Sequence, residues 1–137
     1  MSRMSVLLVD DSPLFLARTV AWLAGEPEIE VVGTATAGAQ AIDLAERIKP
    51  AVVLIDVVMR GMTGIDATWQ LKRLANAPAV VMLTLHGDPA YRAAAAAAGA
   101  DGFVCKADLA TELLPALRRA CRGRADAGCP VDQEDRP

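Results

Sequence analysis

The sequence contains no long apolar segment. Its apolar runs, such as residues 6–9, 51–55 and 79–83, last only four or five residues, whereas a membrane-spanning helix needs about 20. The pattern of a secretory signal peptide is missing as well, because acidic Asp10 and Asp11 directly follow the first apolar run. These absences predict a cytoplasmic protein without membrane contact.

An excess of basic charge and the cysteine spacing of a zinc site are also lacking. Fourteen Lys and Arg residues stand against 17 Asp and Glu residues, which gives a net charge of −3. This domain alone is therefore not expected to attract nucleic acid or anionic membranes. The three cysteines show no C-x-x-C spacing, so the sequence does not support a zinc site. Proteins or small molecules are the expected partners.

What the chain does contain is enough apolar sequence for one core. It has 137 residues, of which 53% are hydrophobic, and this length suits a single domain. From residue 123 onward, Gly, Asp, Arg and Pro replace the large apolar residues. We expect one domain over residues 4–122 and a flexible C-terminal tail over residues 123–137.

Short apolar runs alternate five times with longer helical patterns, which is typical of a parallel sheet covered by helices. Five such units in about 120 residues favour an α/β fold of the flavodoxin-like type over an eight-unit barrel. We therefore predict a doubly wound (βα)5 parallel sheet with strand order 2-1-3-4-5. The predicted strands cover residues 5–9, 29–35, 51–55, 79–84 and 102–105, and the third and fifth helices cover residues 65–74 and 109–121.

Polar residues stand at the carboxyl ends of four predicted strands. Asp10 and Asp11 follow the first strand, Asp56 follows the third, Thr84 ends the fourth and Lys106 follows the fifth. Ligands of open doubly wound sheets bind beyond this edge, where the strand order reverses. Each residue alone has an ordinary explanation, such as capping a helix. All five at one edge predict a functional site.

The chemical types at this edge suit phosphoryl transfer to a carboxylate. Three crowded carboxylates repel one another, and a hard divalent cation with oxygen ligands, such as Mg²⁺, would compensate them. With the cation in place, one carboxylate can accept a phosphoryl group while a hydroxyl and an ammonium hold its oxygens. Thr84 and Lys106 carry these two groups.

Over residues 4–122 the sequence resembles the response-regulator receiver family of two-component signalling. The segments that carry the resemblance are LLVDDSPLF, VLIDVVMRGMTGID, VVMLTLH and AGADGFVCKAD. The spacings agree as well, with 45 positions from Asp11 to Asp56, 28 from Asp56 to Thr84 and 22 from Thr84 to Lys106. The segments LTLH and AGADGFVCKAD look closest to those of the NarL/FixJ subfamily.

The resemblance implies that Asp56 is the phosphoacceptor. It also implies that Asp11 and Asp56 bind Mg²⁺, that Asp10 assists through water, and that the backbone carbonyl of Val58 completes the protein ligands. The implied phosphoryl donor is a phosphohistidine on a sensor histidine kinase or a phosphotransfer protein. The implied output is a changed contact with a downstream protein or with a second copy of the chain.

The resemblance also implies roles for several further residues. Thr84 would turn its hydroxyl toward the phosphoryl group, and Lys106 would pair with another of its oxygens. Phe103 would occupy the aromatic switch position, although packing in the core also explains it. His86 would tune loss of the phosphoryl group, although an exposed loop residue is an equally good interpretation. The positions implied to tune phosphoryl access and loss are Val58, Leu85 and His86.

This sequence departs from the family at three positions. The family commonly has proline four positions after the phosphoacceptor, where Arg60 stands here, so we expect a less rigid loop. Leu85 follows Thr84 where many members have a small residue, which bears on phosphoryl access. Ala107 follows Lys106, so the cis Lys-Pro bond of many receivers is not expected.

Other functions remain as alternatives. The chain could be the receiver half of a DNA-binding regulator, because the NarL/FixJ resemblance normally implies a helix-turn-helix domain after a linker. A flavodoxin-like flavin carrier would need a Ser/Thr/Gly phosphate loop after the first strand, and an aspartate-based phosphatase would need D-x-D. The sequence has Asp-Asp-Ser-Pro-Leu and Asp-Val-Val there. A receiver promotes its own phosphorylation and hydrolysis, and we do not expect an enzyme acting on other substrates.

Overall fold

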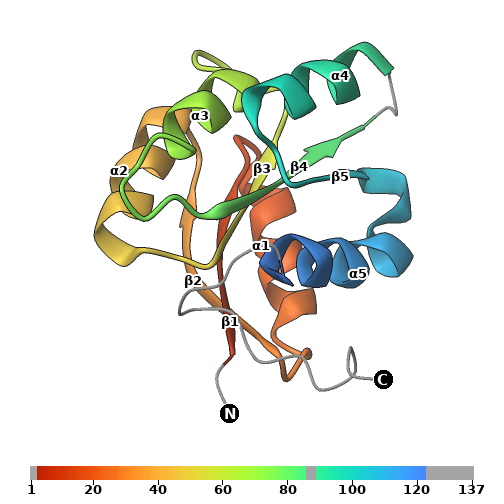
Figure 1. Cartoon of the computed structure of the whole chain (residues 1–137). Helices are drawn as coiled ribbons and strands as arrows, with labels where there is room; N and C mark the ends of the chain where they lie inside the picture. The colour runs from red at the N-terminus through yellow and green to blue at the C-terminus, as the bar shows by residue number, and fades with distance from the viewer. Residues whose placement is uncertain (1–2, 86–88, 123–137) are drawn as a thin grey trace.

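The computed structural model describes residues 3–85 and 89–122. In this part of the chain, five parallel strands form one sheet in the order β2-β1-β3-β4-β5, and Figure 1 shows helices on both sides of it. The strands are β1 (Met4–Val9), β2 (Ile29–Ala35), β3 (Val52–Asp56), β4 (Ala79–Thr84) and β5 (Gly102–Cys105). The predicted (βα)5 fold and its strand order are confirmed.

Helices alternate with the strands, and the local sequence explains where two of them begin. The side chain of Ser12 accepts a hydrogen bond from the backbone N–H of Phe15 and Pro13 is the first helical residue, which is a favourable start for α1. Thr63 caps α3 in the same way through the N–H of Asp66. The helices are α1 (Pro13–Leu23), α2 (Gly38–Ile48), α3 (Gly64–Leu71), α4 (Pro89–Ala98) and α5 (Leu109–Arg122), and a 3₁₀ turn η1 (Lys106–Asp108) precedes α5.

Several predicted boundaries differ from the observed ones by one to three residues. The third helix ends at Leu71 rather than Leu74, because Arg73 and Leu74 donate to carbonyls three residues back and so form a tighter turn than an α-helix. The third strand begins at Val52 rather than Ala51. The N–H of Ala51 donates to the side chain of Ser5, 2.8 Å away.

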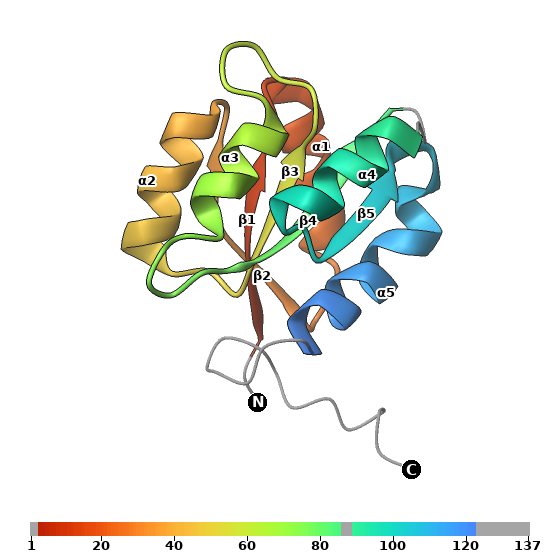
Figure 2. The same cartoon turned by 45° about the horizontal axis from the view of Figure 1, so that its top comes forward.

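The sheet is covered on both faces, and each face has its own apolar core. One core packs β1, β3 and β4 against α1 and α5, and includes Leu8, Leu54 and Leu117. The other packs the opposite side chains of the same strands against α2, α3 and α4, and includes Leu7 and Ile55. Figure 2 shows these two helical layers. Burial on both faces explains why the central strands read as continuous apolar runs.

Parallel pairing brings the carboxyl ends of β1, β3 and β4 to one edge of the sheet. Val9 of β1 lies opposite Ile55 of β3, so the residues that follow them emerge side by side. Asp56 lies opposite Leu83, next to Thr84. None of the helices in the described ranges is long and apolar enough to cross a membrane. The predicted tail, residues 123–137, lies outside the described residues, so its flexibility stays a prediction.

Candidate functional site

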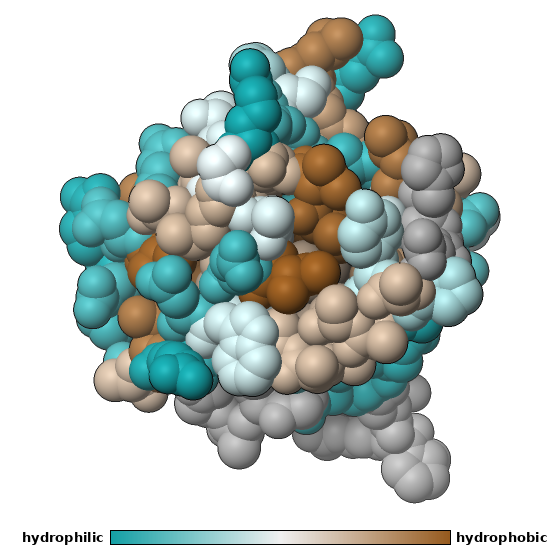
Figure 3. Space-filling view, turned by 90° about the horizontal axis from the view of Figure 1, so that it is seen from above, coloured by the Kyte–Doolittle hydropathy of each residue, from teal (hydrophilic) through white to brown (hydrophobic). Residues whose placement is uncertain are grey.

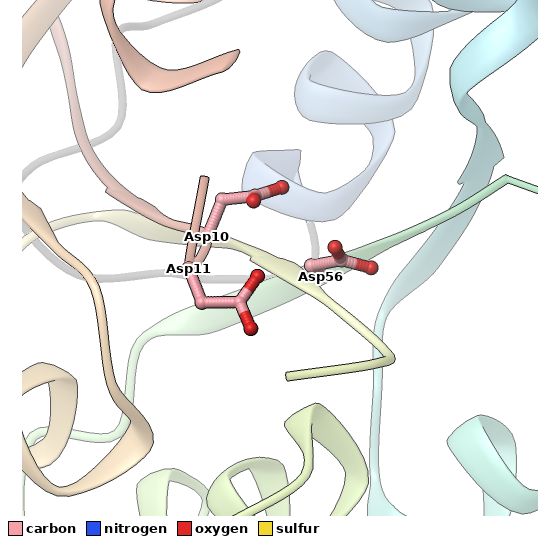
Figure 4. Close-up of side chains that lie close together, drawn as sticks. All are labelled: Asp10, Asp11 and Asp56. Atoms are coloured by element: carbon pink, nitrogen blue, oxygen red, sulfur yellow. The ribbon is translucent and has the colours of Figure 1, made fainter. Parts of the chain in front are cut away.

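Three aspartates meet at the carboxyl edge of the sheet. Asp10 and Asp11 follow β1 directly, and Asp56 is the last residue of β3. Figure 4 shows the three side chains close together. Each offers a carboxylate oxygen, and these oxygens lie within 4.8 Å of one another. Asp10 is 1% exposed and Asp56 is 8% exposed, so two of the three carboxylates are largely removed from water. The predicted convergence of the three acids is confirmed.

Local hydrogen bonds orient two of these carboxylates. Asp10 Oδ1 accepts from the backbone N–H of Ser12 at 2.8 Å, and Asp56 Oδ1 accepts from that of Val58 at 3.2 Å. Both are bonds from an Asp side chain to the backbone two residues on, a pattern for which Asp is favoured in turns. Each carboxylate therefore has one oxygen held by its own loop and a second oxygen directed elsewhere.

The second oxygens of Asp10 and Asp56 share the ammonium of Lys106. Its Nζ lies 2.7 Å from Asp10 Oδ2 and 3.1 Å from Asp56 Oδ2. The Lys106 side chain is 13% exposed, and its Nζ also lies 4.0 Å from the centroid of the Phe15 ring, a cation–π distance. Lys106 thus links the ends of β1, β3 and β5. Its predicted place beside the acids is confirmed, and its contact with Phe15 was not predicted.

Burial raises the pKa of the Asp56 carboxyl above its ordinary value, and the negative charge of Asp10 acts in the same direction. The ammonium of Lys106 and the N–H of Val58 oppose this rise without cancelling it. Burial alone would lower the pKa of Lys106, but its hydrogen bonds to Asp10 and Asp56 and their charges outweigh burial and raise it. The two pKa shifts therefore disfavour charge on Asp56, chiefly through burial, and favour charge on Lys106, through its two carboxylate partners.

Asp11, the most exposed of the three acids, has a different partner. Its Oδ2 accepts from the backbone N–H of Arg60 at 3.0 Å, and the Nε of Arg60 lies 3.6 Å from the same oxygen. The sequence identified Arg60 only as a departure from the usual proline and did not place it in the site. The sequence did carry a signal for this contact, because Arg60 is a basic residue only four positions after Asp56.

Gly64 is a second residue that the sequence reasoning missed. Its N–H donates to the carbonyl of Val57 at 2.9 Å. A Cβ atom added at Gly64 would lie 2.0 Å from the backbone oxygen of Asp56, far inside van der Waals contact. Only glycine fits where the start of α3 passes the end of β3. The second of the two glycines in the segment VLIDVVMRGMTGID was the available signal.

The remaining predicted residues lie around this cluster, and their roles stay predictions. Thr84 is buried at the end of β4, opposite Cys105 in the pairing with β5. Phe103 in β5 is half-buried, and the guanidinium of Arg92 from α4 lies 4.6 Å from its ring centroid. His86 lies outside the described residues. No cis peptide bond occurs in the described ranges, in agreement with the expectation for Ala107.

The rim of the site is partly apolar. Viewed from above, onto the end where β1 and β3 finish, the surface carries hydrophobic patches between hydrophilic residues (Figure 3). Three exposed apolar side chains follow the ends of β1, β3 and β4: Leu14 at 62% exposure, Val58 at 58% and Leu85 at 67%. An acidic site with such neighbours can receive a protein partner as well as a small ion.

The donor set fits a hard divalent cation. Three carboxylates offer only oxygen ligands, and Mg²⁺ commonly binds through one or two carboxylates with the rest of its coordination completed by water. The same place holds a buried carboxylate beside an ammonium. This combination suits the transfer of a phosphoryl group, whose oxygens carry negative charge that cations stabilise.

Comparisons with known proteins agree with this chemistry. A model of the response regulator receiver domain family matches residues 6–118. The transcriptional regulatory protein LiaR of Bacillus subtilis is 37% identical over 118 residues, which are 86% of this chain and 56% of LiaR. The response regulator VraR of Staphylococcus aureus is 34% identical over 122 residues, 88% of this chain and 57% of VraR. The chain thus spans little more than half the length of these relatives.

Solved structures give the same result. The signal receiver domain of NarL from Mycobacterium tuberculosis superposes with a TM-score of 0.84 at 31% identity, covering 90% of this chain and all of that domain. A LuxR-family two-component response regulator from Aurantimonas has a TM-score of 0.84 at 29% identity, covering 90% of this chain and 88% of that one. The similarity to NarL-type receivers agrees with the subfamily resemblance in the sequence.

Proposed function

Since the chain belongs to the response regulator receiver domain family, we propose that it accepts a phosphoryl group on Asp56 with the help of Mg²⁺ and thereby changes its protein contacts. The observation that carries the proposal is the position of Asp56. Its carboxylate ends β3, lies beside Asp10 and Asp11, and contacts the ammonium of Lys106.

In the proposed reaction, a carboxylate oxygen of Asp56 attacks the phosphorus of a phosphohistidine. The phosphorus–nitrogen bond breaks, the imidazole leaves with the electron pair of that bond and takes up a proton, and an acyl phosphate forms on Asp56. The rise in the pKa of Asp56 is limited by the nearby ammonium. Lys106 therefore favours the ionised form of the nucleophile and then pairs with a phosphoryl oxygen.

Asp11 and Asp56 would bind Mg²⁺, with Asp10 assisting through water and the backbone carbonyl of Val58 as a further ligand. When bound, the ion supplies positive charge that stabilises the oxygens of the transferring group. Asp10 keeps the ammonium in place through its 2.7 Å contact. Thr84, at the end of β4, donates its hydroxyl to another phosphoryl oxygen.

The switch would run from Thr84 to Phe103 in the neighbouring strand β5 by a small repacking around β4 and β5. A contact between the ends of β4 and β5 supports this idea, because Cys105 donates its thiol to the carbonyl of Leu85, the residue after β4, at 3.5 Å. Phosphorylation would alter the surface of α4, β5 and α5 and so alter a contact with a downstream protein or with a second copy of the chain.

The proposed donor is a histidine kinase or a phosphotransfer protein, and the cytoplasm is the proposed compartment. The apolar side chains of Leu14 and Val58 beside the acids support docking of a protein rather than entry of a small phosphate ester alone. A second candidate function is that of the receiver half of a transcriptional regulator, as the name of LiaR says of that protein. The match to little more than half of LiaR favours this candidate.

Phosphorylation by acetyl phosphate tests the main proposal. The parent protein should gain the mass of one phosphoryl group in the presence of Mg²⁺, and Asp56→Asn should gain none. Asp43→Asn is a matched control, because Asp43 is an exposed acid on α2 that pairs with Arg47. Labelling of Asp56→Asn at the parent level, or labelling that survives complete chelation of metal, would contradict the proposal. The complete reading frame around this sequence tests the second candidate.

A further inference from the structure

Arg60 contacts one of the three acids, and the proposed phosphoryl chemistry does not use this contact. It lies in the loop between β3 and α3, where its backbone N–H donates to Asp11 Oδ2 at 3.0 Å. The Nε of its guanidinium lies 3.6 Å from the same oxygen. The Arg60 side chain is 89% exposed and that of Asp11 is 26% exposed, so the guanidinium covers Asp11 from the solvent side.

With this contact, every acid of the cluster has a cation supplied by the chain. Lys106, at the end of β5, pairs with Asp10 and Asp56, and Arg60, in the loop after β3, pairs with Asp11. The two cationic side chains differ in their exposure and in the number of contacts that hold them. The Lys106 side chain is 13% exposed and held at three contacts, whereas the Arg60 guanidinium is almost fully in water. Arg60 can therefore leave its carboxylate while Lys106 stays.

We propose that Arg60 sets the Mg²⁺ affinity of the site by competing with the ion for Asp11. The proposal rests on the Mg²⁺ site of the proposed function. The guanidinium has to release Asp11 Oδ2 before that oxygen can face the metal, and its charge then repels a divalent cation nearby. An exposed ion pair of this kind contributes about 0.2 to 1 kcal/mol, which corresponds to a weakening of Mg²⁺ binding by up to about fivefold.

The chain offers a matched control for the charge change. Arg47 pairs with Asp43 at 2.9 Å on α2, and both side chains are exposed, at 67% and 64%. Neither belongs to the acidic cluster, so Arg47→Gln removes one positive charge without touching the site. Arg60→Lys keeps the charge at the site and changes only the shape of the head group.

Titration of the whole chain with MgCl₂ at low ionic strength, followed by calorimetry or by the amide signals of residues 10–12, tests the inference. Arg60→Gln should bind Mg²⁺ about two- to fivefold more tightly than the parent, and Arg60→Lys and Arg47→Gln should stay within about 1.5-fold of it. At about 0.5 M salt, where the screening length falls to about 4 Å, the gap between the parent and Arg60→Gln should close.

Arg60→Pro extends the series, because it also removes the N–H that donates to Asp11. It should bind Mg²⁺ at least as tightly as Arg60→Gln. Unfolding in the presence of chelator shows that each variant is folded, and parent-like stability is expected for a side chain so exposed.

Equal affinities of the parent and Arg60→Gln would overturn the inference, as would equal tightening by Arg47→Gln. If no variant binds Mg²⁺, both the inference and the proposed metal site fail. If acetyl phosphate labels Asp56 in a Mg²⁺-dependent way while the parent and Arg60→Gln bind the ion equally, the proposed function stands and only the role of Arg60 is wrong.

Discussion

Replacing Lys106 by Met removes the ammonium that Asp10 and Asp56 share and keeps most of the side chain's apolar stem. The two carboxylates are 2% and 11% exposed at their side chains, so they are left buried without a cation. Breaking a buried pair in this way typically costs about 3 to 5 kcal/mol. We expect about 3 kcal/mol, the lower end, because Asp11 and the loop after β3 leave the site partly open to water. Loss of the Phe15 contact adds about 0.5 kcal/mol.

The size of this loss should depend on Mg²⁺ and on pH. A divalent cation compensates the same carboxylates and binds the variant more tightly, since the ammonium no longer competes, so saturating Mg²⁺ should shrink the difference from the parent. Without the ammonium, the pKa of Asp56, which burial already raises, rises further above its unfolded value. The folded variant then takes up a proton at a higher pH than the unfolded chain does, so its stability deficit shrinks as the pH falls toward the raised pKa of Asp56.

The stability of the parent protein also depends on pH on the alkaline side, through the titration of Lys106. The pKa of Lys106 is raised in the folded protein because the hydrogen bonds to Asp10 and Asp56 and their charges outweigh burial. The stability from this pair is therefore complete below the unfolded lysine pKa of about 10.4 and is lost as the pH rises through the higher folded value. Acid titration of Asp56 and alkaline titration of Lys106 thus affect stability in separate pH ranges.

Urea unfolding followed by circular dichroism, with chelator and with Mg²⁺, measures these differences. Lys72→Met is the matched control, because Lys72 Nζ lies 2.9 Å from Asp101 Oδ2 and 2.9 Å from the Pro78 carbonyl, away from the three acids. Its loss of stability should not change with Mg²⁺. The double variant Lys106→Met/Asp56→Asn should recover about 1 kcal/mol or more. A loss below about 0.5 kcal/mol in chelator, or one that Mg²⁺ leaves unchanged, would refute the reasoning.

Three further outcomes are expected. Gly64→Ala places a Cβ 2.0 Å from the backbone oxygen of Asp56, so it should destabilise the fold by about 3 kcal/mol or more in urea unfolding, and a parent-like midpoint would contradict the close approach. Val58→Asn introduces a side chain that can orient a hydrolytic water, so the phosphorylated form should decay up to about tenfold faster in a mass-spectrometric time course; an unchanged rate would place Val58 away from the phosphorus. Beryllofluoride, a mimic of the phosphoryl group, should shift the amide signals of Leu85 and Phe103, and shifts confined to the loop after β3 would argue against the switch.

The sequence predicted the parts of the fold that depend on short-range patterns. Strands β2, β4 and β5 begin and end at the predicted residues, and each begins directly after Pro or a charged residue. The end of α3 was missed because the hydrogen-bonding partner of Arg73, three rather than four residues back, leaves no mark on the pattern of apolar residues. The strand order followed from the number of βα units and their length.

The site was predictable to the level of which residues meet, and no further. Residues at the carboxyl ends of neighbouring parallel strands must share an edge, so the meeting of Asp10, Asp56 and Lys106 followed from the topology. Which cation pairs with which acid did not follow from the topology. It depends on the side-chain conformations that place Lys106 over the Phe15 ring and on the loop path that brings Arg60 to Asp11. Neither leaves a periodic pattern in a sequence.

The pairing of Lys106 and Arg60 with the three acids explains how the net charge of the site stays within about one unit of zero in each state of the proposed cycle. Three carboxylates with Lys106 and Arg60 leave one net negative charge, and a bound divalent cation changes it to one net positive charge. Phosphorylation exchanges the single charge of Asp56 for about two at neutral pH, which brings the metal-bound site to about zero. Without Arg60 the metal-free site would carry two negative charges and the metal-bound site would be neutral before any phosphoryl group arrived. Arg60 thus disfavours metal binding in the resting state and favours the phosphorylated, metal-bound state.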